Sequence, residues 1–106
     1  MALFPMSKGG AGAKTLLNQV MRYRIMDAIS ATSALVCENY DSIEMDFTGY
    51  GWSGYRMTVY KKDLTTVLTT FNVTSNTFKK TVDISNEDVI YVIANGNGRM
   101  DFQFLS

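Results

Sequence analysis

The sequence contains no histidine and only one cysteine. Histidine is the usual general base and the commonest zinc ligand, so its absence removes every Ser-His and Cys-His pair. The single cysteine, Cys37, excludes a disulfide within the chain. Its neighbours look like a strand, which favours a small buried hydrophobic residue over a nucleophile. We therefore expect a protein that is not an enzyme and that uses no metal or cofactor.

The chain also has no net charge, because ten basic residues balance ten acidic residues. The pairs Lys61–Lys62 and Lys79–Lys80 do not form a basic patch, so we expect no nucleic acid as a partner. No segment approaches the roughly 20 apolar residues that span a bilayer. The N-terminus has neither the basic segment nor the long apolar run of a signal peptide. These absences predict a soluble protein without a membrane partner.

Most of the sequence alternates between apolar and polar residues, which is typical of half-buried strands. The clearest case is residues 42–48, where Ile43, Met45 and Phe47 share one face. Residues 88–94 are apolar on both faces, so we expect a central strand there. Seven or so short strands separated by turn residues predict an all-β sandwich or barrel. The other predicted strands are residues 55–60, 64–73, 77–84 and 99–105.

The connections between these strands carry recognisable turn residues. Residues 95–98 (Asn-Gly-Asn-Gly) are a strong signal for a hairpin between the last two strands. Asn-x-Asp turns at residues 39–41 and 86–88 each begin a strand, so we expect two equivalent corners where the chain crosses between sheets. Residues 15–35 fit either a helix or two strands. We favour two strands because the rest of the chain is β.

Residues 1–14 differ in composition from the rest of this single domain. The apolar side chains Leu3, Phe4 and Met6 are followed by a linker rich in glycine and alanine. Such a linker is flexible and buries too little surface to order itself. We therefore expect a flexible N-terminal arm in residues 1–14 and a β-sandwich domain in residues 15–106. The arm is either a disordered terminus or an assembly arm that docks on a neighbouring subunit or on its own domain.

The segment between residues 48 and 56 combines three aromatic residues, Tyr50, Trp52 and Tyr55, with three glycines. Aromatic rings on a rigid loop offer a large contact area to sugars or proteins at a small entropic cost. These three are therefore the candidate ligand- or partner-binding residues. The alternative is that Trp52 folds over the end of the core, with the glycines only permitting the turn.

Acidic residues suggest two further sites, each with a simpler explanation. Glu44 and Asp46 share one strand face at a spacing compatible with a glycosidase pair, but that face is the polar one, which favours a solvated surface. A second group could bind calcium, although its spacing matches no EF-hand, and turn residues are the favoured interpretation. This second group is Asp83, Glu87 and Asp88.

The whole pattern resembles small β-sandwich virion structural proteins of bacteriophages and prophages, of the tail-associated, head-fibre or decoration type. The chain departs from the pattern of these proteins in two places: no Trp follows Leu17, and residues 21–28 replace a loop rich in proline and serine. The features that carry the resemblance are the apolar head, the linker ending in residues 14–17 (Lys-Thr-Leu-Leu), residues 39–41 (Asn-Tyr-Asp) opening a strand, and the closing segments 83–86 (Asp-Ile-Ser-Asn) and 95–99 (Asn-Gly-Asn-Gly-Arg).

The resemblance implies a jelly-roll-like antiparallel β-sandwich of about seven to eight strands. It also implies an arm that tethers the protein to a larger assembly, homo-oligomers with a trimer as the expected form, and no catalysis. No catalytic residues carry over. The partners would be further copies of the chain and other virion proteins. The location would be the virion, or the bacterial cytoplasm before assembly.

Two hypotheses of function follow. The leading one is a non-catalytic phage or prophage virion structural protein that acts through protein–protein contacts, with Leu3, Phe4 and Met6 in its assembly arm. The alternative is a carbohydrate-binding module whose aromatic loop stacks on cell-surface glycans.

Overall fold

Short strands make up most of the structure. The computed structural model of the chain describes residues 20–105, and in this part it contains eight strands and one turn of 3-10 helix. The predicted all-β class is confirmed. The elements are β1 (Met21–Ile25), η1 (Ile29–Ala31), β2 (Leu35–Val36), β3 (Ser42–Asp46), β4 (Arg56–Lys61), β5 (Val67–Asn72), β6 (Lys79–Asp83), β7 (Val89–Ala94) and β8 (Gly98–Leu105).

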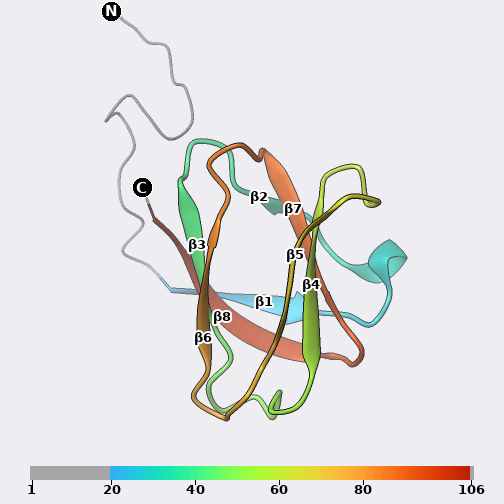
Figure 1. Ribbon diagram of the computed structural model, residues 1–106, viewed down its shortest axis with the longest axis vertical. Helices are drawn as coiled ribbons and strands as arrows, with labels where there is room; N and C mark the ends of the chain where they lie inside the picture. The colour runs from blue at the N-terminus through green and yellow to red at the C-terminus, as the bar shows by residue number, and fades with distance from the viewer. Residues whose placement is uncertain (1–19, 106) are drawn as a thin grey trace, which may run out of the picture.

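The strands form two antiparallel sheets that face each other as a sandwich (Figure 1). One sheet has the order β1-β8-β3-β6 and the other has the order β2-β7-β4-β5. β1 therefore pairs with β8, β2 with β7, β3 with β6 and β4 with β5. Taken in this order, the pairs lie in one sheet and the other by turns. This is the strand order of a jelly roll, in which a long antiparallel ribbon is rolled into two sheets. The expected sandwich is confirmed.

The core lies between the two sheets, because apolar and polar residues alternate along the strands and the apolar ones face the opposite sheet. In β7, which lies between β2 and β4 as expected of a central strand, every second side chain is buried. The sole cysteine, Cys37, is also buried in the core. The largest fully buried side chains are Phe47, Ile25, Ile43, Met45, Met57, Ile84, Ile90 and Met100.

The ambiguous region contains strands, not a long helix. β1 and β2 both fall in it, although β2 has only two residues, and η1 between them has three. The preference for two strands is thus confirmed within residues 20–35. No helix in residues 20–105 is long and apolar enough to cross a bilayer. The predicted arm, residues 1–14, lies outside the described residues, as do Leu3, Phe4 and Met6 within it.

The Asn-Gly-Asn-Gly segment at residues 95–98 does not form a hairpin. It joins β7 to β8, and these strands lie in different sheets and do not pair. The prediction is wrong because turn residues bend the chain but do not determine which sheet the next strand joins. Two of its glycines instead give room to aromatic rings: Gly96 lies against the ring of Tyr55, and Gly98 against the ring of Trp52.

The two Asn-x-Asp segments do form corners, and the corners touch each other. One carries the chain from β2 to β3 and the other from β6 to β7, so both cross between the sheets. The backbone N–H of Cys37 donates to the carbonyl of Asp88 at 2.8 Å, and the N–H of Ile84 donates to the carbonyl of Asp41 at 2.9 Å. These bonds satisfy backbone groups where the regular ladders end.

One carboxylate organises the turn between β4 and β5. Oδ1 of Asp63 accepts from the backbone N–H groups of Thr65 (2.8 Å) and Thr66 (2.7 Å), and Oδ2 accepts from the Thr66 hydroxyl (2.6 Å). Leu64, inside this turn, has a φ of 62°, which is uncommon for a side chain of its size. The hydroxyl and N–H of Thr66, together with the N–H of Thr65, lower the pKa of Asp63 to about 2.

We predict that Asp63 makes the stability of the fold depend on acid pH. Its contribution is complete above its ordinary pKa of 3.8 and disappears as the pH falls to about 2, because only the ionised carboxylate accepts all three bonds. Asp63→Asn should therefore have a lower Tm than the wild type at pH 6, and the two should converge by pH 2. Thermal unfolding followed by circular dichroism measures this. A Tm difference that stays constant across this range would contradict the prediction.

Candidate functional site

The aromatic loop, residues 47–55, closes one end of the sandwich. It carries the chain from β3 in one sheet to β4 in the other. Gly49, Gly51 and Gly54 have φ values of 82°, 78° and 92°. Only glycine adopts such values without strain, so these three positions permit the repeated reversals of the loop.

Trp52 belongs to the core. Its side chain is 2% exposed, and its indole N–H donates to the backbone carbonyl of Arg99 at the start of β8. The ring lies against Gly98, where an added Cβ would come within 2.6 Å of the Trp52 Cζ2 atom. The interpretation in which Trp52 covers the end of the core is therefore the one that the structure shows.

Tyr50 lies over the outer face of the β1-β8-β3-β6 sheet, which we call the β8 face. Its hydroxyl donates to Oδ1 of Asp101 at 2.8 Å, and the guanidinium of Arg22 lies 5.8 Å from the centre of its ring. The hydrogen bond to Asp101 raises the pKa of Tyr50. Tyr50 is thus engaged with its own sheet.

Tyr55 is the most exposed ring of the three, at 37%. It meets Trp52 edge-on, with ring centres 5.2 Å apart and ring planes at 88°. Because Tyr50 turns to the β8 face and Trp52 to the core, the loop does not present the three rings as one flat platform. A role in binding can rest on Tyr55 and on the outer side of Tyr50, but Trp52 supports the loop from inside.

Two ion pairs cross the β8 face. Arg22, Asp101, Asp46 and Lys79 stand in one row across all four strands. Arg22 Nε lies 3.6 Å from Asp101 Oδ1, and Lys79 Nζ lies 4.0 Å from Asp46 Oδ2. Burial raises the pKa of Asp46, but hydrogen bonds from Thr48 and the charge of Lys79 outweigh it, so the pKa is lowered. The two adjacent carboxylates are each flanked by a cation.

The acidic candidates lie on surfaces and in turns. Glu44 projects from β3 on the β8 face beside Asp46, which fits the predicted solvated surface. Asp83 accepts from the N–H (2.9 Å) and hydroxyl (2.7 Å) of Ser85, which fits the predicted turn and lowers its pKa. Within residues 20–105, no three His, Cys, Asp or Glu side chains are grouped so that they could hold a metal ion.

The outer face of the other sheet, which we call the β7 face, has a different composition. Cross-strand register places its outward side chains in rows that are mostly apolar or hydroxyl-bearing. Arg56 carries the only charge among the outward strand residues of this face. Val36 and Val67 are 66% and 47% exposed. The outward residues are Val36 from β2, Val89, Tyr91 and Ile93 from β7, Arg56, Thr58 and Tyr60 from β4, and Val67, Thr70 and Asn72 from β5.

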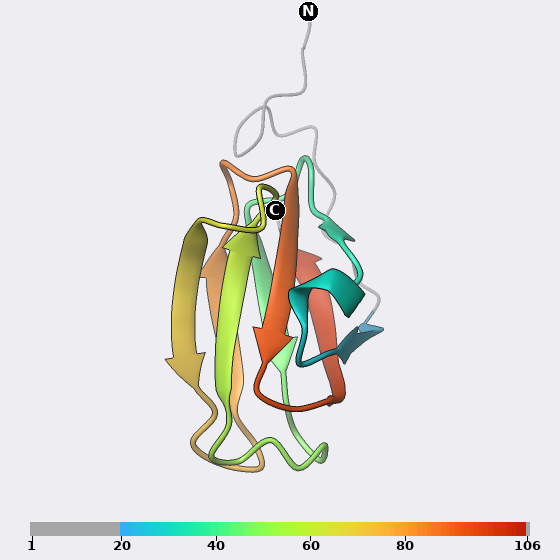
Figure 2. The same ribbon diagram turned by 90° about the vertical axis from the view of Figure 1, so that its right-hand side faces the viewer.

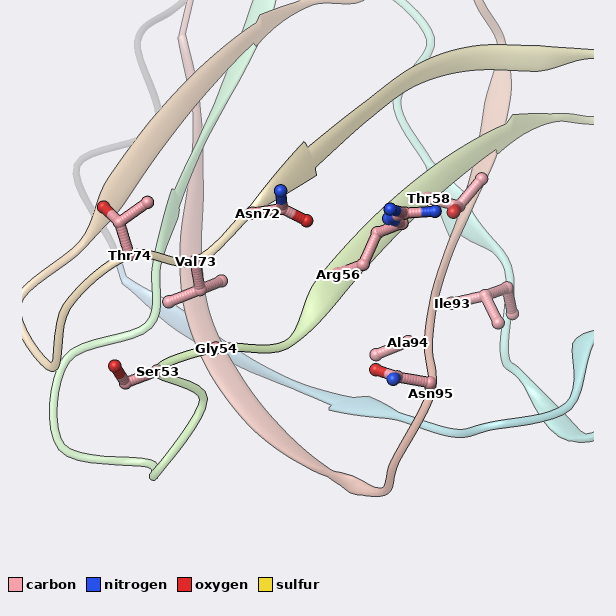
Figure 3. Close-up of a pocket in the computed structure, with 10 residues that line it drawn as sticks. All are labelled: Ser53, Gly54, Arg56, Thr58, Asn72, Val73, Thr74, Ile93, Ala94 and Asn95. Atoms are coloured by element: carbon pink, nitrogen blue, oxygen red, sulfur yellow. The ribbon is translucent and has the colours of Figure 1, made fainter.

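An open groove of about 810 Å³ crosses the β7 face where β4, β5 and β7 approach the aromatic loop. Arg56 lies in the middle, with Asn72 on one side and Ile93 and Asn95 on the other (Figure 3). The lining contains no acidic residue, and none in the described part of the chain forms an ion pair with Arg56. Neutral donors and acceptors around one free guanidinium suit a polar ligand that carries a carboxylate.

We compared the chain with protein-family models, with curated proteins and with solved structures. None of them matches it. Function must therefore be argued from the surfaces described above.

The sequence contains a signal for part of this groove. Arg56 and Thr58 alternate with the buried Met57 and Val59, which predicts that both point outward. The contributions of Asn72 and Asn95 could not be predicted, because they depend on which strands flank β4. The structure therefore adds a site next to the aromatic loop that the loop residues alone do not indicate.

We predict that Gly98 is required for the position of Trp52. In Gly98→Ala the new methyl group meets a ring that is buried and hydrogen-bonded, so unfolding free energy should fall by about 1–3 kcal/mol. The matched control is Gly96→Ala. Its methyl group would lie 2.7 Å from the Tyr55 ring, but that ring is partly exposed and can turn outward.

Gly96→Ala should therefore lower the unfolding free energy by less than about 1 kcal/mol. Both substitutions change the unfolded chain in the same way, so their difference reports the ring contacts. Urea unfolding with a shared m-value measures it. Equal losses at the two positions would show that Trp52 is not held more firmly than Tyr55.

Proposed function

We propose that this chain is a non-catalytic structural protein of a phage or prophage virion, and that it acts through contacts with copies of itself and with other virion proteins. The observation that supports it most is the contrast between the two outer faces. On the β8 face two ion pairs link β1 to β8 and β3 to β6, whereas the outward strand residues of the β7 face are mostly apolar or hydroxyl-bearing and include one charge, Arg56. Apolar side chains that are exposed or partly exposed lie side by side on β2 and β7, namely Val36, Val89, Tyr91 and Ile93. Contiguous apolar surface of this kind is typical of sites where proteins meet.

The fold is compatible with this proposal without proving it. Jelly rolls occur in viral capsid proteins, but also in lectins and other binding proteins, so the fold by itself carries no function. The apolar residues Leu3, Phe4 and Met6 add a second candidate for assembly contacts. They precede β1, whose place is at the edge of its sheet.

The test is the mass of the full-length protein in solution, by light scattering after size exclusion. We expect a stable multiple of the chain mass, with a trimer as the favoured number. Replacing Leu3, Phe4 and Met6 together by serine should weaken the assembly if the arm docks on a neighbouring subunit. Thr81→Ser, which changes an exposed residue of β6 on the other sheet and neither the arm nor the β7 face, is the control. A monomer at every concentration would count against self-assembly.

The groove supports a second candidate function, a carbohydrate-binding module for sugars that carry a carboxylate. Sugar hydroxyls both donate and accept, and the side chains of Thr58, Asn72 and Asn95 offer the same capacity. The guanidinium of Arg56 would bind the carboxylate through two parallel bonds. This candidate moves the predicted glycan site from the aromatic loop to the sheet beside it.

Calorimetric titration with uronic-acid oligosaccharides tests the second candidate. Arg56→Gln should weaken binding at least about tenfold, because a hydrogen bond to a charged group is lost. The control is Arg24→Gln, which removes an exposed guanidinium from β1 on the other sheet. Neutral sugars of the same linkage should bind wild type and both variants alike. Equal effects of the two substitutions would rule out a specific site at Arg56.

A further inference from the structure

The two sheets of the sandwich have four edge strands, and three of them are protected against pairing with another chain. β2 has only two residues. β1 carries Arg22 and Arg24, and β6 carries Lys79, Lys80 and Asp83. Short edges and charged edges are the usual means by which proteins prevent strand addition.

The fourth edge, β5, has neither protection in its own residues, and a nearby charge is the ammonium of Lys80 on β6, 5.7 Å from the centre of the Phe71 ring. No charged residue and no proline occurs in residues 64–78, which contain β5 and both of its flanks. Threonine, valine and phenylalanine make up most of this stretch, and they favour extended backbone. Figure 2 shows β5 at the left side of its sheet, with β4 as the neighbour on its inner side.

The backbone of β5 has groups free to pair on its outer side. The N–H and C=O of Val73 both bond to the β4 side, at Tyr55 (2.9 Å) and Gly54 (2.7 Å). Successive residues of an antiparallel strand direct their backbone groups to opposite sides. Phe71 therefore also bonds to β4, whereas Thr70 and Asn72 direct their N–H and C=O groups to the free edge.

We propose that β5 is a self-pairing edge, where a second copy of this chain adds its own β5 in antiparallel orientation and extends the sheet across a two-fold axis. This inference rests on the proposed function, because it names a contact between copies. As a two-fold contact it joins two chains or two trimers, so it is separate from the contacts that would close a trimer. We name a second copy of the chain as the partner because two β5 edges can pair without bringing like charges together. A charged strand would meet its own charge near the axis, and this strand has none.

The structure also selects the register. The ladder between β4 and β5 shifts at Val59/Tyr60, so only the part of β5 from Thr69 onward is regular. Pairing centred on Phe71 places the free N–H and C=O of Thr70 opposite those of Asn72 in the other copy. Side chains on the same side of the sheet then meet, with Phe71 opposite Phe71. Such a short ladder buries less than a stable interface requires, so association through β5 alone is weak and depends on concentration.

Amide hydrogen exchange of the full-length protein, measured at increasing concentration, tests the pairing directly. At a concentration about ten times the dissociation constant found by light scattering, only about a fifth of the chains are free, so exchange at Thr70 should slow about fivefold. Asn72 should slow in the same way. Thr69 and Phe71 are the internal controls, because their N–H groups bond to β4 and are protected at every concentration.

Two variants act on the edge without disturbing the β4 ladder. Thr70→Lys places two like charges at diagonal positions beside the axis and should raise the dissociation constant about tenfold. Its matched control is Thr81→Lys on β6, an edge that already carries lysines, and the dissociation constant should not change. Thr70→Pro removes an N–H that β4 does not use, which an edge strand tolerates, and it should abolish the concentration-dependent protection of Asn72.

The outcomes separate this inference from the proposed function. Self-association with unchanged exchange at Thr70 and Asn72 would overturn pairing through β5 and leave the proposed function standing. Protection that appears only when a different protein is added would show that the occupant is not a second copy. A protein that stays monomeric at all concentrations would overturn both.

Discussion

Burial of one face of every strand against the opposite sheet is the constraint on which the rest of this structure depends. The chain is rolled so that each antiparallel pair lies across from the next, and alternate residues of both sheets fill the space between them. Phe47 and Trp52 extend this packing to the end of the sandwich, where the chain changes sheets. The aromatic loop therefore closes the end of the core, and any role in binding is additional to this structural role.

Once one face of each sheet is buried, the other is free to take on a separate role, and the two outer faces differ. The β8 face carries two ion pairs, and Tyr50 adds its hydroxyl to Asp101 and its ring to Arg22. Exposed pairs of this kind contribute little to stability. Within the described residues the β7 face has no ion pair, and its guanidinium stands among neutral side chains.

The same contrast holds for the edges of the sheets. Charge or shortness protects β1, β2 and β6, whereas β5 is uncharged and has backbone groups directed outward. The groove and the β5 edge adjoin, because Asn72 contributes its side chain to one and its backbone to the other. The two surfaces that we consider functional therefore share one residue.

The strands could be located from the sequence because alternation is local: each strand's own residues determine which side must be buried. The burial of Cys37 and the two Asn-x-Asp corners that cross between the sheets were likewise predicted from local patterns, whereas the contact between the corners was seen only in the structure. Pairing partners are not local, which is why residues 95–98 bend the chain into the other sheet and not into a hairpin. The groove joins Arg56, Asn72 and Asn95 only through the order β7-β4-β5. Sequence determined which side chains face outward, and the tertiary structure decided which of them meet, because strands far apart in the chain become neighbours only when the core is packed.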